Sequence, residues 1–240
     1  QFFLHFQFNG WFLFAVLALF LLQIKIKIDE KKFQLFYILL VSATIFTLAL
    51  PISWYLDHPI FYWINGLGVL LQLVAFLLFI QIIKPHFRVF FSSLKRIEKL
   101  IYGFALFSLV LKIGIQIVAL LPGLDKVSHQ IRNFVIGYIH LTMLGIISGF
   151  LLGFALQNKF LKGTTIWANW GLKSFLLGFV ATEMLLLIQG AYLFLGLGEF
   201  PLYQQSLFIA SIGLPAGLLM QIIGIYQSDE RLKIKIIPRD

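Results

Sequence analysis

The chain has no cysteine among its 240 residues. This absence excludes disulfides, thiolate catalysis, iron–sulfur clusters and zinc sites with cysteine ligands. Charged residues are also scarce at 12%, whereas hydrophobic residues make up 60%. Ordinary globular domains are about 45–50% apolar and about 25% charged. A soluble fold could not bury so much apolar surface, so the composition predicts a membrane protein.

The sequence also lacks the motifs of common enzymes and receptors. It contains no phosphate-binding loop, zinc-protease motif or nucleophile elbow. A retinal protein would need a Schiff-base lysine in its last membrane helix, and a G-protein-coupled receptor would carry acidic-Arg-Tyr and Asn-Pro-x-x-Tyr motifs. None of these stands at the required place. The absences disfavour a soluble enzyme and both of those seven-helix classes.

Long apolar runs dominate what is present. A membrane-spanning helix needs about 20 mostly apolar residues. Seven runs have about this length: Phe2 to Leu22, Leu35 to Leu56, Phe61 to Ile83, Leu100 to Leu121, Arg132 to Leu156, Leu172 to Leu197 and Gln205 to Tyr226. The sequence therefore predicts an all-α bundle of seven transmembrane helices, with residues 1–240 forming one membrane-embedded domain in the lipid bilayer.

Positive charges alternate between the connections of these runs. The first, third and fifth connections and the tail hold Lys25, Lys27, Lys31, Lys32, Lys84, Arg88, Lys95, Arg96, Lys99, Lys159, Lys162, Lys173, Arg231, Lys233, Lys235 and Arg239. The second and sixth connections hold no Lys or Arg. The positive-inside rule then places the N-terminus outside and the C-terminus in the cytoplasm, in a bacterial inner membrane. We interpret the net charge of +9 as these topology signals and contacts with anionic lipids, not as a nucleic-acid site.

The beginning of the chain suggests a missing part. Position 1 is Gln, and the first methionine is Met143. The first apolar run starts at once, without a basic segment or a cleavage site for a signal peptide. We interpret the chain as the C-terminal fragment of a longer protein, whose N-terminal helices are expected to be partners of this bundle.

A glycine ridge marks the fifth run. Gly145, Gly149 and Gly153 recur every four residues, and Gly137 precedes them by eight. Small residues at this spacing let another helix approach closely. The pattern predicts a helix–helix contact along Gly145, Gly149 and Gly153.

Two oppositely charged residues lie inside apolar runs. Lys112 shares a helix face with Ser108 and Gln116, and Glu183 lies near the middle of the sixth run. A charge at the centre of a membrane helix costs at least about 2.5–3.5 kcal/mol, so each residue needs a partner or a role. One interpretation is a Lys112–Glu183 ion pair that joins two helices. The other is a proton or ion relay in a transporter.

Two histidines lie in the outer half of their runs. Asn9 follows His5 on the same helix face, and His140 lies eight residues after Arg132. A lone histidine in a helix is usually a hydrogen-bonded core residue. Two at similar depth also suggest axial ligands to haem iron, with His5 and His140 as the metal ligands. The sequence has no CxxCH motif, so this haem would be held non-covalently.

Short segments around these histidines carry a resemblance. His5-Phe6-Gln7-Phe8-Asn9-Gly10-Trp11-Phe12 and Gly137-Tyr138-Ile139-His140-Leu141 resemble an uncharacterised bacterial multi-pass family distantly similar to haem–copper oxidase subunit I and NnrS-type proteins. The resemblance implies haem ligands in the outer half of the membrane. His58-Pro59-Ile60-Phe61-Tyr62 is similar to the oxidase His-Pro-Glu-Val-Tyr motif, but Ile60 replaces the Glu and the segment also suits a helix that starts at proline.

Three functions follow from these observations. The first is a haem-binding redox or sensory module that uses His5 and His140. The second is a proton- or ion-coupled transporter centred on Lys112 and Glu183; Gly/Pro-interrupted segments such as Gly213-Leu214-Pro215 can mark a broken helix at a transporter's binding site. The third is a structural or assembly subunit.

Overall fold

The computed structural model describes residues 2–25, 29–56, 58–121, 123–124, 127, 130–161 and 165–236. Its principal helices are α1 (Phe2–His5), η1 (Phe6–Phe12), α2 (Leu13–Ile24), α3 (Glu30–Thr47), α4 (Ala49–Ser53), α5 (Pro59–Ser93), α6 (Arg96–Val118), α8 (Arg132–His140), η2 (Leu141–Ile147), α9 (Ser148–Gln157), α10 (Ile166–Phe194) and α11 (Tyr203–Ile236). The two η segments are π-helical. No strand occurs in the described ranges, which confirms the all-α prediction.

Seven helical segments among the described residues are long and apolar enough to cross a membrane. They are Phe2–Ile24, Glu30–Ser53, Pro59–Ser93, Arg96–Val118, Arg132–Gln157, Ile166–Phe194 and Tyr203–Gln227. Each overlaps one predicted run, so the predicted number of spans is confirmed. The chain is an integral, multi-pass membrane protein. The predicted orientation of its termini stays a prediction.

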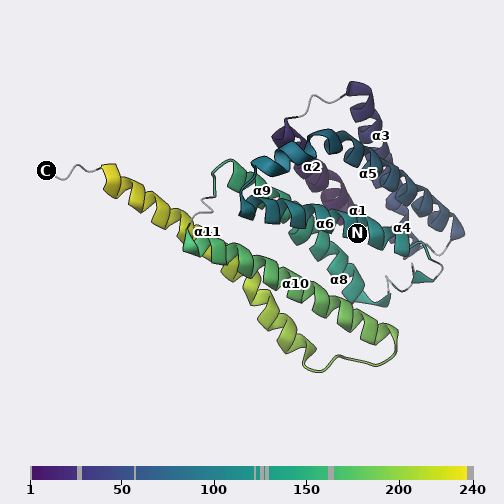
Figure 1. Cartoon of the computed structure of the whole chain (residues 1–240). Coiled ribbons are helices and arrows are strands. Elements are labelled where there is room, and N and C mark those ends of the chain that lie inside the picture. The colour runs from purple at the N-terminus through teal and green to yellow at the C-terminus, as the bar shows by residue number, and fades with distance from the viewer. Residues whose placement is uncertain are drawn as a thin grey trace.

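The spans form a bundle with a hairpin at its side (Figure 1). The first five spans pack around one another, and α10 lies against α8 at the edge of this group. The last helix, α11, pairs with α10, and its C-terminal part extends beyond the end of α10. Only 17% of the most apolar 18-residue stretch of this last span is buried, so most of the surface of α11 is left for lipid.

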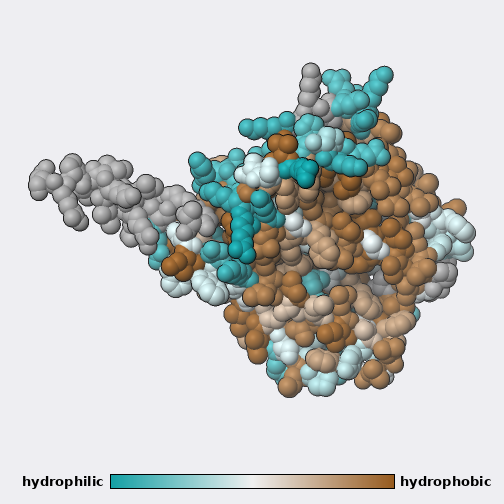
Figure 2. All heavy atoms as spheres, in the orientation of Figure 1, coloured by the Kyte–Doolittle hydropathy of each residue, from teal (hydrophilic) through white to brown (hydrophobic). Residues whose placement is uncertain are grey.

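Hydrophilic residues gather at one end of the molecule (Figure 2). Below that end, the visible side of the bundle is a broad hydrophobic surface. Exposed basic residues such as Lys31, Lys84, Lys95 and Lys159 belong to the basic connections. Because consecutive spans run in opposite directions, alternate connections meet at the same end. The arrangement agrees with the alternation of charge in the sequence.

The glycine ridge of the fifth span packs against α6. A Cβ atom added to Gly145 would lie 2.7 Å from Ser108 Oγ, one on Gly149 would lie 2.9 Å from Ala105 Cβ, and one on Gly153 would lie 2.8 Å from the ring of Tyr102. Tyr102, Ala105 and Ser108 follow one another at three-residue spacing along α6. The three glycines therefore let two helices of this chain approach to a distance that any side chain would prevent.

Glycines also join α10 to α11, and they correct one prediction. A Cβ on Gly171 would lie 2.6 Å from the carbonyl oxygen of Gly217, and one on Gly213 would lie 3.1 Å from Gly178 Cα. The prediction of a helix broken at Gly213-Leu214-Pro215 is wrong, because α11 continues through Pro215. Gly213 serves close packing against α10.

Aromatic side chains fill one half of the bundle. Phe20 lies at the centre of the group, with ring centroids 6.2 Å from Phe79, 5.7 Å from Phe90, 5.4 Å from Tyr102 and 4.9 Å from Phe150. All five side chains are at least 94% buried. We call these five residues the aromatic plug. Phe20 lies late in the first span and Tyr102 early in α6, so the plug occupies the half of the bundle near the basic connections.

Candidate functional site

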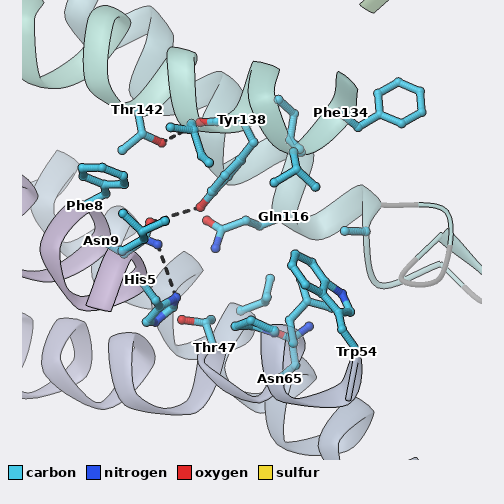
Figure 3. Close-up of a pocket in the computed structure, with 18 residues that line it drawn as sticks. His5, Phe8, Asn9, Thr47, Trp54, Asn65, Gln116, Phe134, Tyr138 and Thr142 are labelled. Atoms are coloured by element: carbon cyan, nitrogen blue, oxygen red, sulfur yellow. Dashed lines mark hydrogen bonds between the residues drawn. The ribbon is translucent and has the colours of Figure 1, made fainter. Parts of the chain in front are cut away.

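A partly enclosed cavity of about 170 Å³ lies in the other half of the bundle (Figure 3). Its polar or amphipathic lining residues are His5, Asn9, Thr47, Trp54, Asn65, Gln116, Tyr138 and Thr142. Its apolar lining residues are Leu4, Phe8, Leu50, Pro51, Val69, Ile115, Ala119, Phe134, Val135 and Ile139. These residues come from the first five spans. Trp54 and Ala119 directly follow α4 and α6, so the cavity reaches the end of the bundle with the charge-poor connections.

A directional chain of hydrogen bonds forms one wall of the cavity. The Tyr138 hydroxyl donates to Asn9 Oδ1 at 3.2 Å, and Asn9 Nδ2 lies 3.4 Å from His5 Nδ1. His5 Nε2 lies 2.8 Å from the carbonyl oxygen of Thr44. A carbonyl can only accept, so Nε2 carries a hydrogen, and in the neutral ring Nδ1 then accepts from Asn9. Both nitrogens of His5 are therefore engaged within the bundle.

Lys112 lies behind the cavity wall among neutral partners. Its side chain is 1% exposed. Its ammonium donates to Gln116 Oε1 at 3.1 Å and lies 5.3 Å from the centroid of the Tyr138 ring. Gln72 Nε2 donates to the same Gln116 oxygen at 2.6 Å. Because Gln116 Oε1 accepts hydrogen bonds from both groups, the orientation of the Gln116 amide is fixed. Gln116 Nε2 is then left to donate to other partners.

Two amide groups on the cavity wall have unused hydrogen-bonding capacity. Asn65 is only 3% exposed and makes no side-chain hydrogen bond with a described residue, but its polar atoms are not among the fully buried ones without a partner, so they face the space of the cavity. The Gln116 nitrogen likewise donates to no residue that the structure describes. Polar groups that face a cavity without a protein partner commonly bind ordered water, and they are free to bind a ligand in its place.

Two π-helical segments border the cavity. The first, η1, begins directly after His5, and the second, η2, begins directly after His140. Asn9 lies in η1 and Thr142 lies in η2, and the two segments contact each other. Interruptions of this kind inside α-helices occur frequently at functional sites. No pattern in the sequence indicated either segment.

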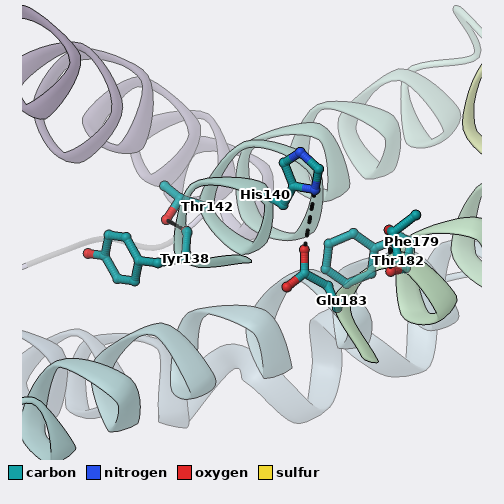
Figure 4. Close-up of polar contacts among 6 residues, drawn as sticks. All are labelled: Tyr138, His140, Thr142, Phe179, Thr182 and Glu183. Carbon is teal, nitrogen blue, oxygen red and sulfur yellow. Dashed lines mark hydrogen bonds and ion pairs between the residues drawn. The ribbon is translucent and has the colours of Figure 1, made fainter. Parts of the chain in front are cut away.

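His140 and Glu183 lie apart from the cavity, between α8 and α10 (Figure 4). His140 Nδ1 and Glu183 Oε1 are 3.7 Å apart, and neither atom has a hydrogen-bond partner among the described residues. Tyr138 and His140 point to opposite sides of α8. This is expected for residues two positions apart on a helix with 3.6 residues per turn.

The structure corrects the predicted ion pair. No ion pair joins Lys112 to Glu183 in the described part of the chain. Lys112 instead bonds to Gln116, and Glu183 contacts His140. The predicted proximity of Asn9 to His5 and of Gln116 to Lys112 is confirmed, because both pairs lie within hydrogen-bond distance. Sequence spacing along one helix identified these neighbours, but it could not identify contacts between helices.

The described residues do not fit a haem in this arrangement. His5 lines the cavity with both ring nitrogens engaged, whereas His140 faces α10 from the other side of α8. A cavity of about 150 Å³ holds benzene, and a porphyrin has many times more atoms than benzene. Haem ligation by His5 and His140 stays a prediction from the sequence.

No protein-family model matches the chain, and neither does any curated protein or solved structure. The resemblance to haem–copper oxidase subunit I and NnrS-type proteins therefore stays a prediction too. His5, Asn9 and Gln116 were predicted as site residues from the sequence, whereas Asn65 and Tyr138 were not. Asn65 and Tyr138 each stand among apolar residues near the start of a span. A polar residue inside a membrane span was the feature of the sequence that could have identified them as site residues.

Proposed function

We propose that the chain forms the substrate-binding unit of a membrane transporter. Its substrate is a small uncharged molecule with an apolar body and one polar end that carries an amide or hydroxyl group. The observation that carries this proposal is the amide of Asn65, which lines a mostly apolar cavity and makes no hydrogen bond with a described residue. Ligand sites commonly combine apolar walls with a few placed polar groups.

The size and polarity of the cavity support this class of substrate. Its volume of about 170 Å³ is close to the roughly 150 Å³ that accommodates benzene in a protein interior. The amides of Asn65 and Gln116 supply donors, and Asn65 also supplies an acceptor. No Asp, Glu, Lys or Arg side chain lines the cavity in the part of the chain that the structure describes. Moving a neutral polar group from water into this cavity therefore costs less free energy than moving a charged group would.

The position of the aromatic plug supports transport as the activity. The cavity reaches the charge-poor end of the bundle, and the plug around Phe20 fills the half near the basic end. A transporter alternates between states that open to one side and close to the other. The arrangement matches a state that is accessible from the charge-poor side.

Benzamide is a suitable probe, because it joins an aromatic ring to a neutral amide. Purified protein in detergent is titrated with benzamide, and toluene serves as the ligand without a polar end. We expect Asn65→Leu to weaken benzamide binding about tenfold, since an unmade buried hydrogen bond costs about 1–3 kcal/mol. The same variant should leave toluene binding unchanged or improved.

Asn169→Leu is the matched control. Asn169 is exposed on α10 and does not line the cavity, so this variant should bind benzamide like the unaltered protein. Equal losses in both variants would refute the site. Exchange of labelled benzamide across reconstituted vesicles, compared with empty vesicles, then tests transport. Binding without accelerated exchange would refute the transporter assignment and leave a binding protein.

A further inference from the structure

We propose that His140 and Glu183 form a proton-binding site that acts on the cavity through α8. The second part of this proposal rests on the proposed function, whereas the first part does not. The site takes one proton, which lies on Glu183 Oε1 and is donated in a hydrogen bond to His140 Nδ1. No other ligand and no electron transfer are involved.

The two side chains approach each other without forming a hydrogen bond. His140 Nδ1 and Glu183 Oε1 face each other at 3.7 Å, and both atoms are buried without a hydrogen-bond partner among the described residues. An ionised carboxylate and an imidazole with its hydrogen on Nε2 would present two acceptors to each other. One proton converts this contact between acceptors into a hydrogen bond, whose usual length is below about 3.2 Å.

The surroundings favour a proton over another counter-ion. The Glu183 side chain is 14% exposed, and a Cβ atom on Gly137 would lie 3.5 Å from its Oε2. The carboxylate thus lies close against a bare stretch of the α8 backbone, a place where an ionised group has little access to water. The neutral Glu183–His140 pair avoids burying two charges, which costs several kcal/mol per ion.

Other titratable groups on the neighbouring elements face elsewhere. Lys112 of α6 contacts Gln116 and the Tyr138 ring. Tyr203, at the start of α11, accepts a hydrogen bond from Asn133 of α8. His140 is therefore the titratable partner that the structure places at Glu183. The His140 side chain is 37% exposed at the surface of the bundle.

The helix α8 connects this site to the cavity. Tyr138 lines the cavity from one side of α8, and His140 contacts Glu183 from the other. Directly after His140 the helix passes into the π-helical η2, whose Thr142 also lines the cavity. A shorter His140–Glu183 distance would draw this part of α8 toward α10. The Tyr138–Asn9 wall of the cavity would then move with it.

Infrared spectroscopy tests the proton site without any ligand. At about pH 7, exposed carboxylates are ionised, so a carboxylic acid C=O band reports a buried protonated group. We expect this band in the unaltered protein and its loss in Glu183→Gln. Glu98→Gln is the control, because Glu98 is also buried but accepts the Lys95 backbone N–H at 2.8 Å. The absence of the band, or its loss only in Glu98→Gln, would overturn the proposal.

A cysteine in the cavity tests the coupling. The chain has no native cysteine, so Leu50→Cys places a single thiol on the cavity wall. The rate at which this thiol reacts with N-ethylmaleimide is measured from about pH 6 to pH 9. At each pH the rate is divided by that of the double variant Leu50→Cys/Glu183→Gln. This ratio removes the effect of pH on the ionisation of the thiol itself. We expect this ratio to change about fivefold across the range, the lower end of typical couplings between sites.

A constant ratio would overturn the coupling through α8. If the infrared band depends on Glu183 but benzamide does not bind, the proton site stands and the proposed substrate class fails. If benzamide binds but the band is absent, the proton site fails and the proposed function stands. The two proposals are therefore separated by their own measurements.

Discussion

At the scale of single residues, Lys112 shows how a charge is held in this membrane bundle. Its ammonium has a neutral oxygen from Gln116 and the face of the Tyr138 ring as partners. A cation over an aromatic face gains about 2 kcal/mol or more when both are desolvated. Lys112 therefore does not require Glu183, and the two residues belong to different parts of the structure.

This separation predicts additive effects of two substitutions. We expect the changes in the free energy of unfolding for Lys112→Met and Glu183→Gln to add within about 1 kcal/mol, because the two side chains share no direct contact and the proposed coupling through α8 is of about that size. The measurement is a double-mutant cycle on unfolding in detergent. A coupling of about 3 kcal/mol, as for a broken buried ion pair, would contradict the contacts described here and restore the Lys112–Glu183 pair.

The haem prediction can be tested at the same scale. Because both ring nitrogens of His5 are engaged and His140 faces Glu183, we expect added haemin to give no Soret shift that depends on either histidine. The measurement is an absorption titration of the purified protein and of His5→Ala and His140→Ala. A six-coordinate haem spectrum that is lost in both variants would support the haem-binding interpretation.

At the scale of elements, close helix contacts depend on particular glycines. A Cβ at position 149 would lie 2.9 Å from Ala105 Cβ, within a contact between helices that cannot give way easily. We expect Gly149→Ala to lower the free energy of unfolding by about 1–3 kcal/mol, the usual cost of overpacking. Unfolding in detergent measures this change.

Gly103 provides the matched control on the partner helix. A Cβ at this position would meet nothing within 4 Å. Gly103→Ala should therefore raise stability by about 0.5–1 kcal/mol, because alanine loses less conformational freedom in a helix interior. If both alanine variants changed stability in the same direction, close packing at Gly149 would not explain its effect.

The spans were predictable from the sequence, whereas details within them were not. Apolar length fixes where a helix must cross a membrane, and four-residue glycine spacing identified the face that packs on α6. The π-helical segments after His5 and His140 have no signal in the apolar pattern of the sequence. The pairing of Glu183 with His140 depends on which helices become neighbours, and apolar periodicity contains no information on that choice.

At the scale of the whole molecule, the aromatic plug and the cavity divide the bundle into two halves. Phe20 is 1% exposed and touches four other aromatic rings. We expect Phe20→Ala to cost about 3–5 kcal/mol of stability, as is usual for a buried phenylalanine. Phe107→Ala is the control, since Phe107 is 61% exposed on α6 and should change stability by no more than about 0.5 kcal/mol. Similar losses in both variants would show that the ring contacts of Phe20 do not stabilise the bundle.

The orientation of the whole bundle follows from its charge distribution. The basic connections meet at one end, so the positive-inside rule predicts that this end faces the cytoplasm and that the cavity is reached from outside. Because the chain has no cysteine, His58→Cys, Lys95→Cys and Glu199→Cys each introduce a single thiol. An impermeant maleimide applied to intact cells should label the variants at positions 58 and 199 and spare the one at position 95. The reverse pattern would invert the bundle, and the same cavity would then receive its substrate from the cytoplasm.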